Sequence, residues 1–465
     1  MILKVKDENG QFKEVVLKGL KGEKGDRGED GTVLQQKEID DIKSSLDTII
    51  QKNDSYRVNV KYPPMGYIGA KGDGVTNDTE AIQKLINDFY HIEIPKGVYL
   101  IDKLELMPKT KIEGCGDDTV LKANNSSEIG FICISNNPIY DVHMSNMYIE
   151  GNGVNQQHGL YFKATPHKDS PYHGGLWLST FKNLTIKNFR YGQISLLSGS
   201  NALLPNQGLV FERVETRVAN YPDSIALLIE GQTEQVLWNQ CAFSGENIAN
   251  NVVVFRRERG MNNESIGDIG GNGQTFIQCY VGCGKTGISL ERSFNIKFNN
   301  MYFETLNKCI NLKTVCENII ISGSEFRTCS IYNDDDYILN AENICSFILE
   351  NNKIIGTVRN FVQGWGNGII RNNESYNFLV ENEEIDSGID NGTLNVRSKS
   401  IRTAGTITNI SCLGYTRERI ILKAWGREIV LNGDGNISTP TTIPQGHYAI
   451  LEPLQGRWVI TYKSY

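Results

Sequence analysis

Residues 298–303 read FNNMYF, and eight further segments repeat this phrase: an apolar residue, often Asn two positions later, and then alternation. The other phrases start at residues 144, 181, 211, 238, 276, 321, 349 and 370, so successive starts are 21 to 38 residues apart. A period of roughly 20 to 50 residues indicates stacked structural repeats. The irregular spacing favours a parallel β-helix, because its turns accept loops of different lengths between the strands.

The third position of the phrase predicts a sharp corner of the chain. Asn and Gly tolerate the left-handed conformation that such a corner needs, and stacked amides can bond from rung to rung. The third positions are Asn146, Asn183, Arg213, Gln240, Gln278, Asn300, Gly323, Asn351 and Asn372. The fourth and sixth positions should then face inward, and the fifth and seventh outward. A β-sandwich with coincidental asparagines is the alternative.

The stretch YIGAKGDGVTNDTEAIQ at residues 67–83 predicts a helix that closes the start of the repeat array. Asp78 or Thr79 can cap this helix, whose apolar positions are Ile82, Leu85 and Ile86. The stretch resembles the opening motif of pectate-lyase-like right-handed β-helix proteins. The resemblance implies that this fold covers residues 67 to about 390. We find no positions that match the calcium-binding Asp clusters or the catalytic Arg of true pectate lyases.

The first sixty residues predict an assembly of three chains. Residues 2–17 alternate around Asn9-Gly10, as in a β-hairpin, and glycine then recurs at every third position from Gly19 to Gly31, as in a collagen triple helix. In residues 33–53 the apolar residues Ile39, Ile42, Leu46 and Ile49 form the seam of a coiled coil. Together these patterns favour a homotrimer. The alternatives are a flexible charged linker and an ordinary amphipathic helix.

This N-terminal arrangement resembles the adaptor of tail fibres from bacteriophages of Gram-positive hosts. The chain is therefore similar to phage tailspike and preneck appendage proteins. The expected organisation is an all-β protein in four parts: an attachment segment at 1–31, a coiled coil at 32–60, the β-helix at 61–392 and a β-sandwich at 393–465. In the last part, core packing is favoured over sugar stacking for Trp425 and Trp458.

Composition narrows the classes of function. The net charge of −7 argues against a nucleic-acid binder. No apolar run is long enough to span a membrane, and residues 1–19 lack a signal-peptide core, so we expect synthesis in the host cytoplasm and release by lysis. The ten cysteines form no CxxC pair or zinc spacing and are expected to be buried free thiols, and no cofactor or metal is predicted.

Two outward carboxylates, Glu304 and Glu325, are the candidate catalytic pair. They fall on adjacent rungs at neighbouring outward positions, which places their backbones about 8 Å apart. Inverting glycosidases separate their two carboxyl groups by roughly 6.5–9.5 Å. Glu215 is a further catalytic candidate, and Asp223, Asp268 and Glu150 stay open. Exposed ion pairs of Glu325 with Arg327 and of Glu215 with Arg217 are the competing interpretation.

The candidate substrate-binding residues are aromatic rings and arginines. Tyr280 and Tyr302 offer stacking platforms for a saccharide, or else an interface between chains. Arg217 occupies an outward position on an earlier rung. Arg256 and Arg257 belong to an insertion at residues 247–274 that is expected to bind an anionic polymer, unless it is a solvated charge run. A second insertion, at residues 151–177, carries His158, His167, Asp169, Tyr172 and His173, for which a metal site is the less favoured interpretation.

The expected protein is a trimeric virion spike. It docks to phage tail or neck proteins through residues 1–31 and binds a host cell-wall glycopolymer, teichoic acid or polysaccharide, along its β-helix. Cleavage of that polymer by paired carboxylates is favoured over binding alone. The alternative is a non-catalytic adhesin on the same framework.

Overall fold

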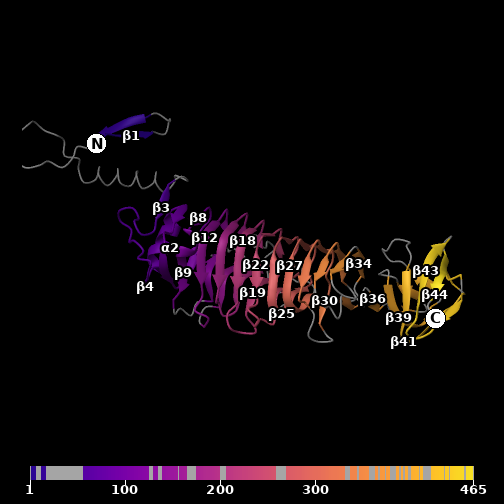
Figure 1. The fold of residues 1–465 in the computed structure, drawn as a ribbon. Helices are drawn as coiled ribbons and strands as arrows, with labels where there is room; N and C mark the ends of the chain where they lie inside the picture. The colour runs from indigo at the N-terminus through magenta and orange to yellow at the C-terminus, as the bar shows by residue number, and fades with distance from the viewer. Residues whose placement is uncertain are drawn as a thin grey trace, which may run out of the picture. The chain divides into compact units, whose positions relative to one another are not determined.

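The computed structural model describes most of the chain from residue 56 onward, together with two short strands near the N-terminus (Figure 1). The described residues are 2–6, 12–16, 56–124, 129–134, 139–154, 157–164, 174–198, 206–257, 269–329, 336–342, 345–355 and shorter pieces between 362 and 463. Residues Met1–Ile50 and Gln51–Tyr465 form two separate units.

The first unit contains the hairpin that the sequence predicts. Strands β1 (Ile2–Lys6) and β2 (Phe12–Val16) pair antiparallel, with Ile2 opposite Val16. The turn at Asn9-Gly10, the glycine repeat and the coiled-coil seam lie outside the described residues. The prediction of three chains therefore stays a prediction.

Helix α2 (Thr79–Asp88) lies at the start of the β-helix, as its apolar spacing predicts. Its buried residues are Ile82, Leu85 and Ile86. Asp78 stands at the N-cap position, but its side chain makes no cap hydrogen bond. Its carboxylate instead accepts bonds from the backbone N–H groups of Lys71 (2.7 Å) and Gly72 (2.9 Å). The capping prediction is wrong for the Asp78 side chain, which holds the preceding glycine turn.

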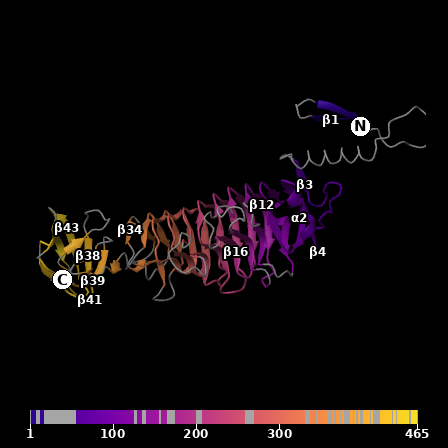
Figure 2. The same ribbon diagram turned by 180° about the vertical axis from the view of Figure 1, so that it is seen from behind.

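The second unit contains a right-handed parallel β-helix, which confirms the predicted fold class. Every described strand pairing between β3 (Arg57–Asn59) and β35 (Glu374–Tyr376) is parallel. In Figure 1 the strands of the β-helix follow one another in chain order, from indigo near α2 to orange at β34 (Asn367–Arg371). Figure 2 shows the same order from the opposite side.

One rung illustrates how the chain coils. Strand β15 (Thr180–Lys187) is followed by β16 (Gly192–Ser198) and by the short β17 (Asn206–Gln207). The chain then returns to β18 (Val210–Arg217), which pairs with β15 so that Val210 lies beside Thr180. The repeated phrases of the sequence are therefore the first strands of successive rungs.

The predicted corners are confirmed in the described residues. All eight described third positions of the phrase have φ between 51° and 65°, and they include Arg213, Gln240 and Gln278 as well as the Asn and Gly residues. The amides also stack as expected: Nδ2 of Asn183 donates a 2.7 Å bond to Oδ1 of Asn146. Asn372, the ninth position, lies outside the described residues.

The interior is filled by side chains that stack along the axis. The rings of five successive rungs are in contact, with centroids 4.2 to 5.7 Å apart, through Phe181, Phe211, Trp238, Phe276 and Phe298. Such stacking contributes dispersion energy in addition to apolar burial.

A second interior column, directly after the corners, passes hydrogen bonds from rung to rung. Backbone N–H groups donate to the side chain of the next rung: Cys241 to Cys279, Met301 to Ser324, and Ser324 to Asn352. These bonds satisfy amides that the sharp corner withdraws from the strand ladder.

The described cysteines are free, as expected, but they are not all buried. Cys115 is exposed and Cys283 is half-buried, because both lie at turns rather than at inward strand positions. Cys412 lies outside the described residues.

The C-terminal region contains two β-sheets. Both are mixed, with parallel and antiparallel strand pairs, whereas a purely antiparallel sandwich was expected. Strand β39 (Ser400–Ile407) pairs parallel with β41 (Ile420–Leu431), which pairs antiparallel with β43 (Tyr448–Leu454). Strand β36 (Glu384–Asp386) already belongs to the larger of these sheets. Trp458 is buried in the core of this region, as expected; the side chain of Trp425 is not among those described. No described helix is long and apolar enough to cross a membrane.

Candidate glycan-binding and catalytic face

The candidate site lies on the strand segments that follow the corners. These segments are β22 (Ala242–Ser244), the first part of β25 (Tyr280–Glu291), the first part of β27 (Tyr302–Lys313) and β29 (Glu325–Arg327). Their middle residues are buried phenylalanine or valine, so the residues on either side face outward. Two outward columns result: Glu215, Ala242, Tyr280, Tyr302 and Glu325, and beside them Arg217, Ser244, Gly282, Glu304 and Arg327.

Tyr280 and Tyr302 form a stacked aromatic surface on neighbouring rungs. Their ring centroids are 5.9 Å apart and the rings are inclined by 26°. The Tyr280 hydroxyl lies 3.4 Å from Sγ of Cys283, which lies three residues later. Burial raises the pKa of both tyrosines, so both hydroxyls stay protonated at neutral pH and can donate hydrogen bonds.

Glu304 and Glu325 lie on the diagonal that the sequence predicts. Strand β27 pairs with β29 so that Tyr302 lies beside Glu325 and Glu304 lies beside Arg327. One rung and two residues along a strand separate their backbones, about 8 Å. Their partners differ. Oε1 of Glu304 accepts a 3.3 Å hydrogen bond from the Tyr302 hydroxyl, whereas Oε1 of Glu325 pairs with Arg327 at 3.0 Å.

Arg327 completes a compact group of side chains. Its guanidinium lies 5.7 Å from the centre of the Tyr302 ring while it pairs with Glu325. Lys353 adds a second cation, 4.0 Å from Glu325. We call Tyr280, Tyr302, Glu304, Glu325 and Arg327 the Tyr302 patch. The patch contains two carboxylates in different charge environments beside an aromatic surface.

Glu215 and Arg217 lie on the same two columns, two rungs before Tyr280 and Gly282. Arg217 pairs with Glu215 at 2.6 Å. The small side chains of Ala242 and Ser244 separate this pair from the Tyr302 patch. The predicted residues of this face are therefore brought onto one surface, but Glu215 does not adjoin the other two carboxylates.

Arg256 and Arg257 lie away from the strand segments that carry the Tyr302 patch. Arg256 ends β23 (Asn251–Arg256), which pairs with the second part of β25, beyond the left-handed corner at Cys283. Arg256 is mostly buried, pairs with Glu230 at 2.6 Å and donates a 2.9 Å bond to the Tyr191 hydroxyl. Arg257 lies 3.6 Å from Glu291. Both arginines are thus engaged within the protein and apart from the Tyr302 patch.

The residue pattern indicates His158 only as part of a possible metal site, but the structure places it in a buried polar pair near Arg256. Nδ1 of His158 lies 2.7 Å from Oγ of Ser195, on neighbouring strands. Burial, together with the smaller effect of the Arg256 charge, lowers the pKa of His158 to about 4. The other residues of the possible metal site, from His167 to His173, lie outside the described residues. Among the described residues no three metal-ligating side chains are grouped.

Comparison with protein families places the fold in a known group. The sequence profile of the rhamnogalacturonase A/epimerase, pectate lyase-like family matches residues 66–331. The chain belongs to this family. This agrees with the resemblance of residues 67–83 to the opening motif of pectate-lyase-like proteins.

Comparison with curated proteins gives no match. Among solved structures, the A-module of mannuronan C-5 epimerase AlgE6 from Azotobacter vinelandii is 16% identical, with a TM-score of 0.45, over 69% of this chain and 100% of that one. Tailspike protein 2 of bacteriophage CBA120 is 12% identical, with a TM-score of 0.47, over 68% of this chain and 47% of that one. A GH87 α-1,3-glucanase from Streptomyces thermodiastaticus is 13% identical, with a TM-score of 0.46, over 79% of this chain and 70% of that one.

Proposed function

We propose that the protein binds a glycan along the outward face of its β-helix and hydrolyses it at the Tyr302 patch. The observation that carries this proposal is the diagonal of Glu304 and Glu325 beside two stacked tyrosines. Membership of a family named for rhamnogalacturonase and epimerase supports a polysaccharide ligand. Sugar rings present apolar faces that stack on aromatic side chains, and the columns extend far enough to contact a chain of several units.

In this proposal the two carboxylates have different roles. Glu304, whose partner is a hydroxyl, donates its proton to the glycosidic oxygen as the bond from that oxygen to the anomeric carbon breaks. Glu325, beside the cationic Arg327, accepts a proton from a water molecule. The oxygen of that water forms the new bond to the anomeric carbon from the opposite face, so the product has inverted configuration.

A second candidate function is binding without cleavage. It is favoured by the ion pair of Glu325 with Arg327, which occupies one of the two carboxylates. On this alternative the patch is a recognition surface, and the rings and Arg327 contact the sugar.

The experiment incubates the full-length protein with purified cell-wall glycopolymers, namely teichoic acid and capsular polysaccharide, and follows polymer length by gel electrophoresis and mass spectrometry. Shortening supports hydrolysis, and co-sedimentation with unchanged chain length supports the adhesin. Glu317→Gln is the matched control for the carboxylate variants, because Glu317 is an exposed acid on another part of the same coil.

The biological setting is part of the proposal. We infer a phage tailspike or appendage protein that attaches to the virion through residues 1–31 and acts on the host surface during adsorption. Its support is the N-terminal hairpin together with the glycine repeat and the apolar seam that follow it in sequence. A homotrimer predicts a solution mass three times the 52.1 kDa of one chain, which light scattering on the intact protein measures.

A further inference from the structure

The most exposed apolar side chains of the described residues all belong to one short stretch between β3 and α2. In the part of the chain that the structure describes, the large apolar side chains that are 75% exposed or more are those of Tyr62, Met65, Ile68 and Val75, and Met65 reaches 92%. All other large apolar side chains described are exposed by 70% or less. Single exposed apolar residues are ordinary, but a concentration of them marks an interaction surface.

Residues 61–69 form a closed loop, which we call the Tyr62 loop. Its neck is fixed by a 2.8 Å hydrogen bond from the backbone N–H of Ala70 to the carbonyl of Val60. The two ends of the loop also touch, because a Cβ atom on Gly69 would lie 2.6 Å from the carbonyl oxygen of Lys61. Compact surface loops whose ends lie together are frequently functional.

The tip of the Tyr62 loop is a tight turn that presents Met65 to solvent. The backbone N–H of Tyr67 donates a 3.2 Å hydrogen bond to the carbonyl of Pro64, so Met65 and Gly66 are the central residues of the turn. Gly66 has φ 96°, a conformation that glycine adopts without strain. The turn therefore fixes the position of the most exposed of these apolar side chains.

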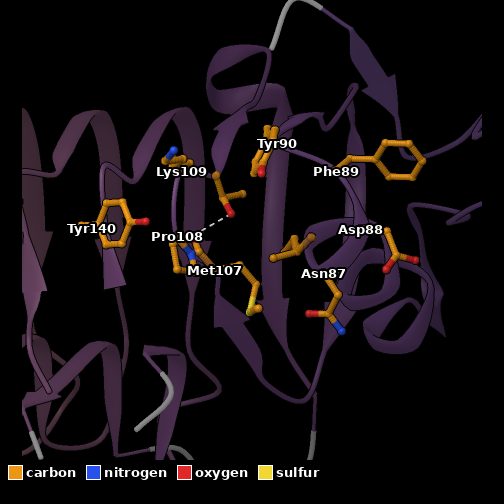
Figure 3. Close-up of a pocket in the computed structure, with 10 residues that line it drawn as sticks. Asn87, Asp88, Phe89, Tyr90, Met107, Pro108, Lys109 and Tyr140 are labelled. Carbon is orange, nitrogen blue, oxygen red and sulfur yellow. Dashed lines mark hydrogen bonds between the residues drawn. The ribbon is translucent and has the colours of Figure 1, made fainter. Parts of the chain in front are cut away.

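Tyr67 anchors the loop to the body of the protein. Its hydroxyl donates a 3.1 Å hydrogen bond to Oδ2 of Asp88, and its ring centroid lies 5.2 Å from that of Phe89. Asp88 ends helix α2 and Phe89 follows it; both line the pocket drawn in Figure 3, where they point away from Tyr140. The loop thus turns one ring toward the protein and leaves its other apolar side chains outside. A surface whose shape is fixed in advance loses little conformational freedom on binding.

The composition of the loop favours a copy of itself as the partner. Residues 62–69, YPPMGYIG, contain no charged residue, whereas the whole chain has a net charge of −7. Copies related by a rotation axis bring the same residues together, so charged groups near the axis would repel one another. An uncharged apolar segment avoids this repulsion and gains free energy from burial.

The place of the loop in the chain points to the same partner. Arg57, the first residue of β3, lies eight residues after Ile49, the last apolar residue of the predicted coiled-coil seam. A segment of this length spans at most about 27 Å. In the homotrimer proposed above, the three β3 strands therefore start near one axis, and the Tyr62 loop directly follows β3. A seam that joins three chains also raises the effective concentration of their loops, so a small apolar contact suffices.

We propose that the Tyr62 loops of three copies of this chain pack against one another around the axis of the homotrimer, with Met65 of each copy at the centre. This inference rests on the homotrimer of the proposed function. It adds the surface through which the β-helix units contact one another, and it assigns the loop to further copies of this chain in place of a glycan or another virion protein.

The experiment places a cysteine at the tip of the loop in the full-length protein. Met65→Cys is made in a Cys115→Ser background, because Cys115 is exposed. A short bis-maleimide is added, and cross-linked dimers are separated on a denaturing gel. The control is Val154→Cys in the same background, since Val154 is 66% exposed and lies outside the loop. We expect about fivefold more dimer, or a larger excess, from Met65→Cys, because the rotation axis places its copies together.

A second measurement tests what the contact contributes to assembly. Met65→Ser replaces a side chain that is almost fully exposed in the single chain, so it should not disturb the fold. It should raise the trimer dissociation constant about tenfold or more in sedimentation equilibrium, because the buried apolar side chain is lost from each copy. Val154→Ser should leave the constant unchanged. Far-UV circular dichroism confirms that both variants keep their β structure.

The outcomes separate this inference from the proposed function. A single-chain mass for the original protein would refute the homotrimer and the loop contact together. A trimer in which Met65→Cys forms no more dimer than Val154→Cys would refute the loop contact alone. Glu304→Gln, which tests hydrolysis, should leave the cross-linking of Met65→Cys unchanged, so loss of cleavage in that variant and loss of the loop contact are read independently.

Discussion

Tyr302 donates a 3.3 Å hydrogen bond from its hydroxyl to Glu304, two residues further along the same strand, while its ring stacks on that of Tyr280. One side chain thus serves both the aromatic surface and the proposed acid. The two contributions can be separated by substitution.

We predict that Tyr302→Phe lowers kcat about fivefold and leaves KM nearly unchanged, because the ring stays and one hydrogen bond of about 1 kcal/mol is lost. Tyr302→Ala should also raise KM, since it removes the ring. Steady-state rates of polymer cleavage measure both. Tyr148→Phe, on the same outward column several rungs earlier, is the control. A rise in KM with unchanged kcat in Tyr302→Phe would show that the hydroxyl binds substrate instead of positioning Glu304.

The pair of His158 and Ser195 predicts a dependence of stability on pH. The pKa of His158 is about 4 in the folded protein against 6.5 for an unperturbed histidine, so between these values the unfolded chain binds more protons. The stabilisation is complete above about pH 6.5 and is lost as the pH falls to about 4. The free energy of unfolding decreases by about 3 kcal/mol over this range.

Urea unfolding midpoints measured from pH 4 to 7 test this effect. His158→Gln should flatten the decline toward low pH, whereas His143→Gln should preserve it, because the His143 side chain is 45% exposed. If the stability of both variants declines toward low pH as that of the original protein does, burial of His158 is not the cause of the decline.

Arg256 and Arg257 provide a matched pair of neighbouring arginines. Arg256→Ala removes the cation that lies 2.6 Å from the mostly buried Glu230 carboxylate, so we predict a loss of about 2–4 kcal/mol in the free energy of unfolding. Arg257→Ala breaks a more exposed pair and should cost less than about 1 kcal/mol. Chemical denaturation measures both. Neither variant should alter KM for the polymer, and a raised KM in a stably folded Arg256→Ala protein would instead make this arginine a substrate contact.

The corner at Asn183 predicts an ordered series of stabilities. Asn183→Gly keeps the left-handed conformation and loses the 2.7 Å hydrogen bond to Asn146. It should therefore lower the free energy of unfolding by about 1 kcal/mol or less. Asn183→Val places a β-branched residue at φ 51° and should cost about 2–3 kcal/mol. Denaturation midpoints report the order. Equal stabilities would mean that the corner conformation exerts no control over the fold.

The corners also explain why so much of the fold follows from the sequence. The repeated phrase marks one residue per rung that must adopt a left-handed conformation, and alternation then assigns the neighbours to the inside or the outside. Arg213 shows the limit of residue type alone. An arginine rarely adopts φ near 52°, and only its place in the phrase indicates the corner.

The candidate site was predictable in part for the same reason. Counting from the corner places Glu304 and Glu325 on one diagonal, and the observed register agrees. Contacts that bring distant segments together carry no such local signal. Arg256 and Tyr191 are 65 residues apart, and no local pattern predicts the hydrogen bond between them.

The roles of the two carboxylates are tested most directly by comparing polymer cleavage by the original protein with that by Glu304→Gln, Glu325→Gln and the control Glu317→Gln. We predict that the original protein and Glu317→Gln shorten the glycopolymer at similar rates, and that each of the two patch variants loses at least a hundredfold in rate while still co-sedimenting with the polymer. Full cleavage by both patch variants would show that Glu304 and Glu325 do not catalyse the reaction.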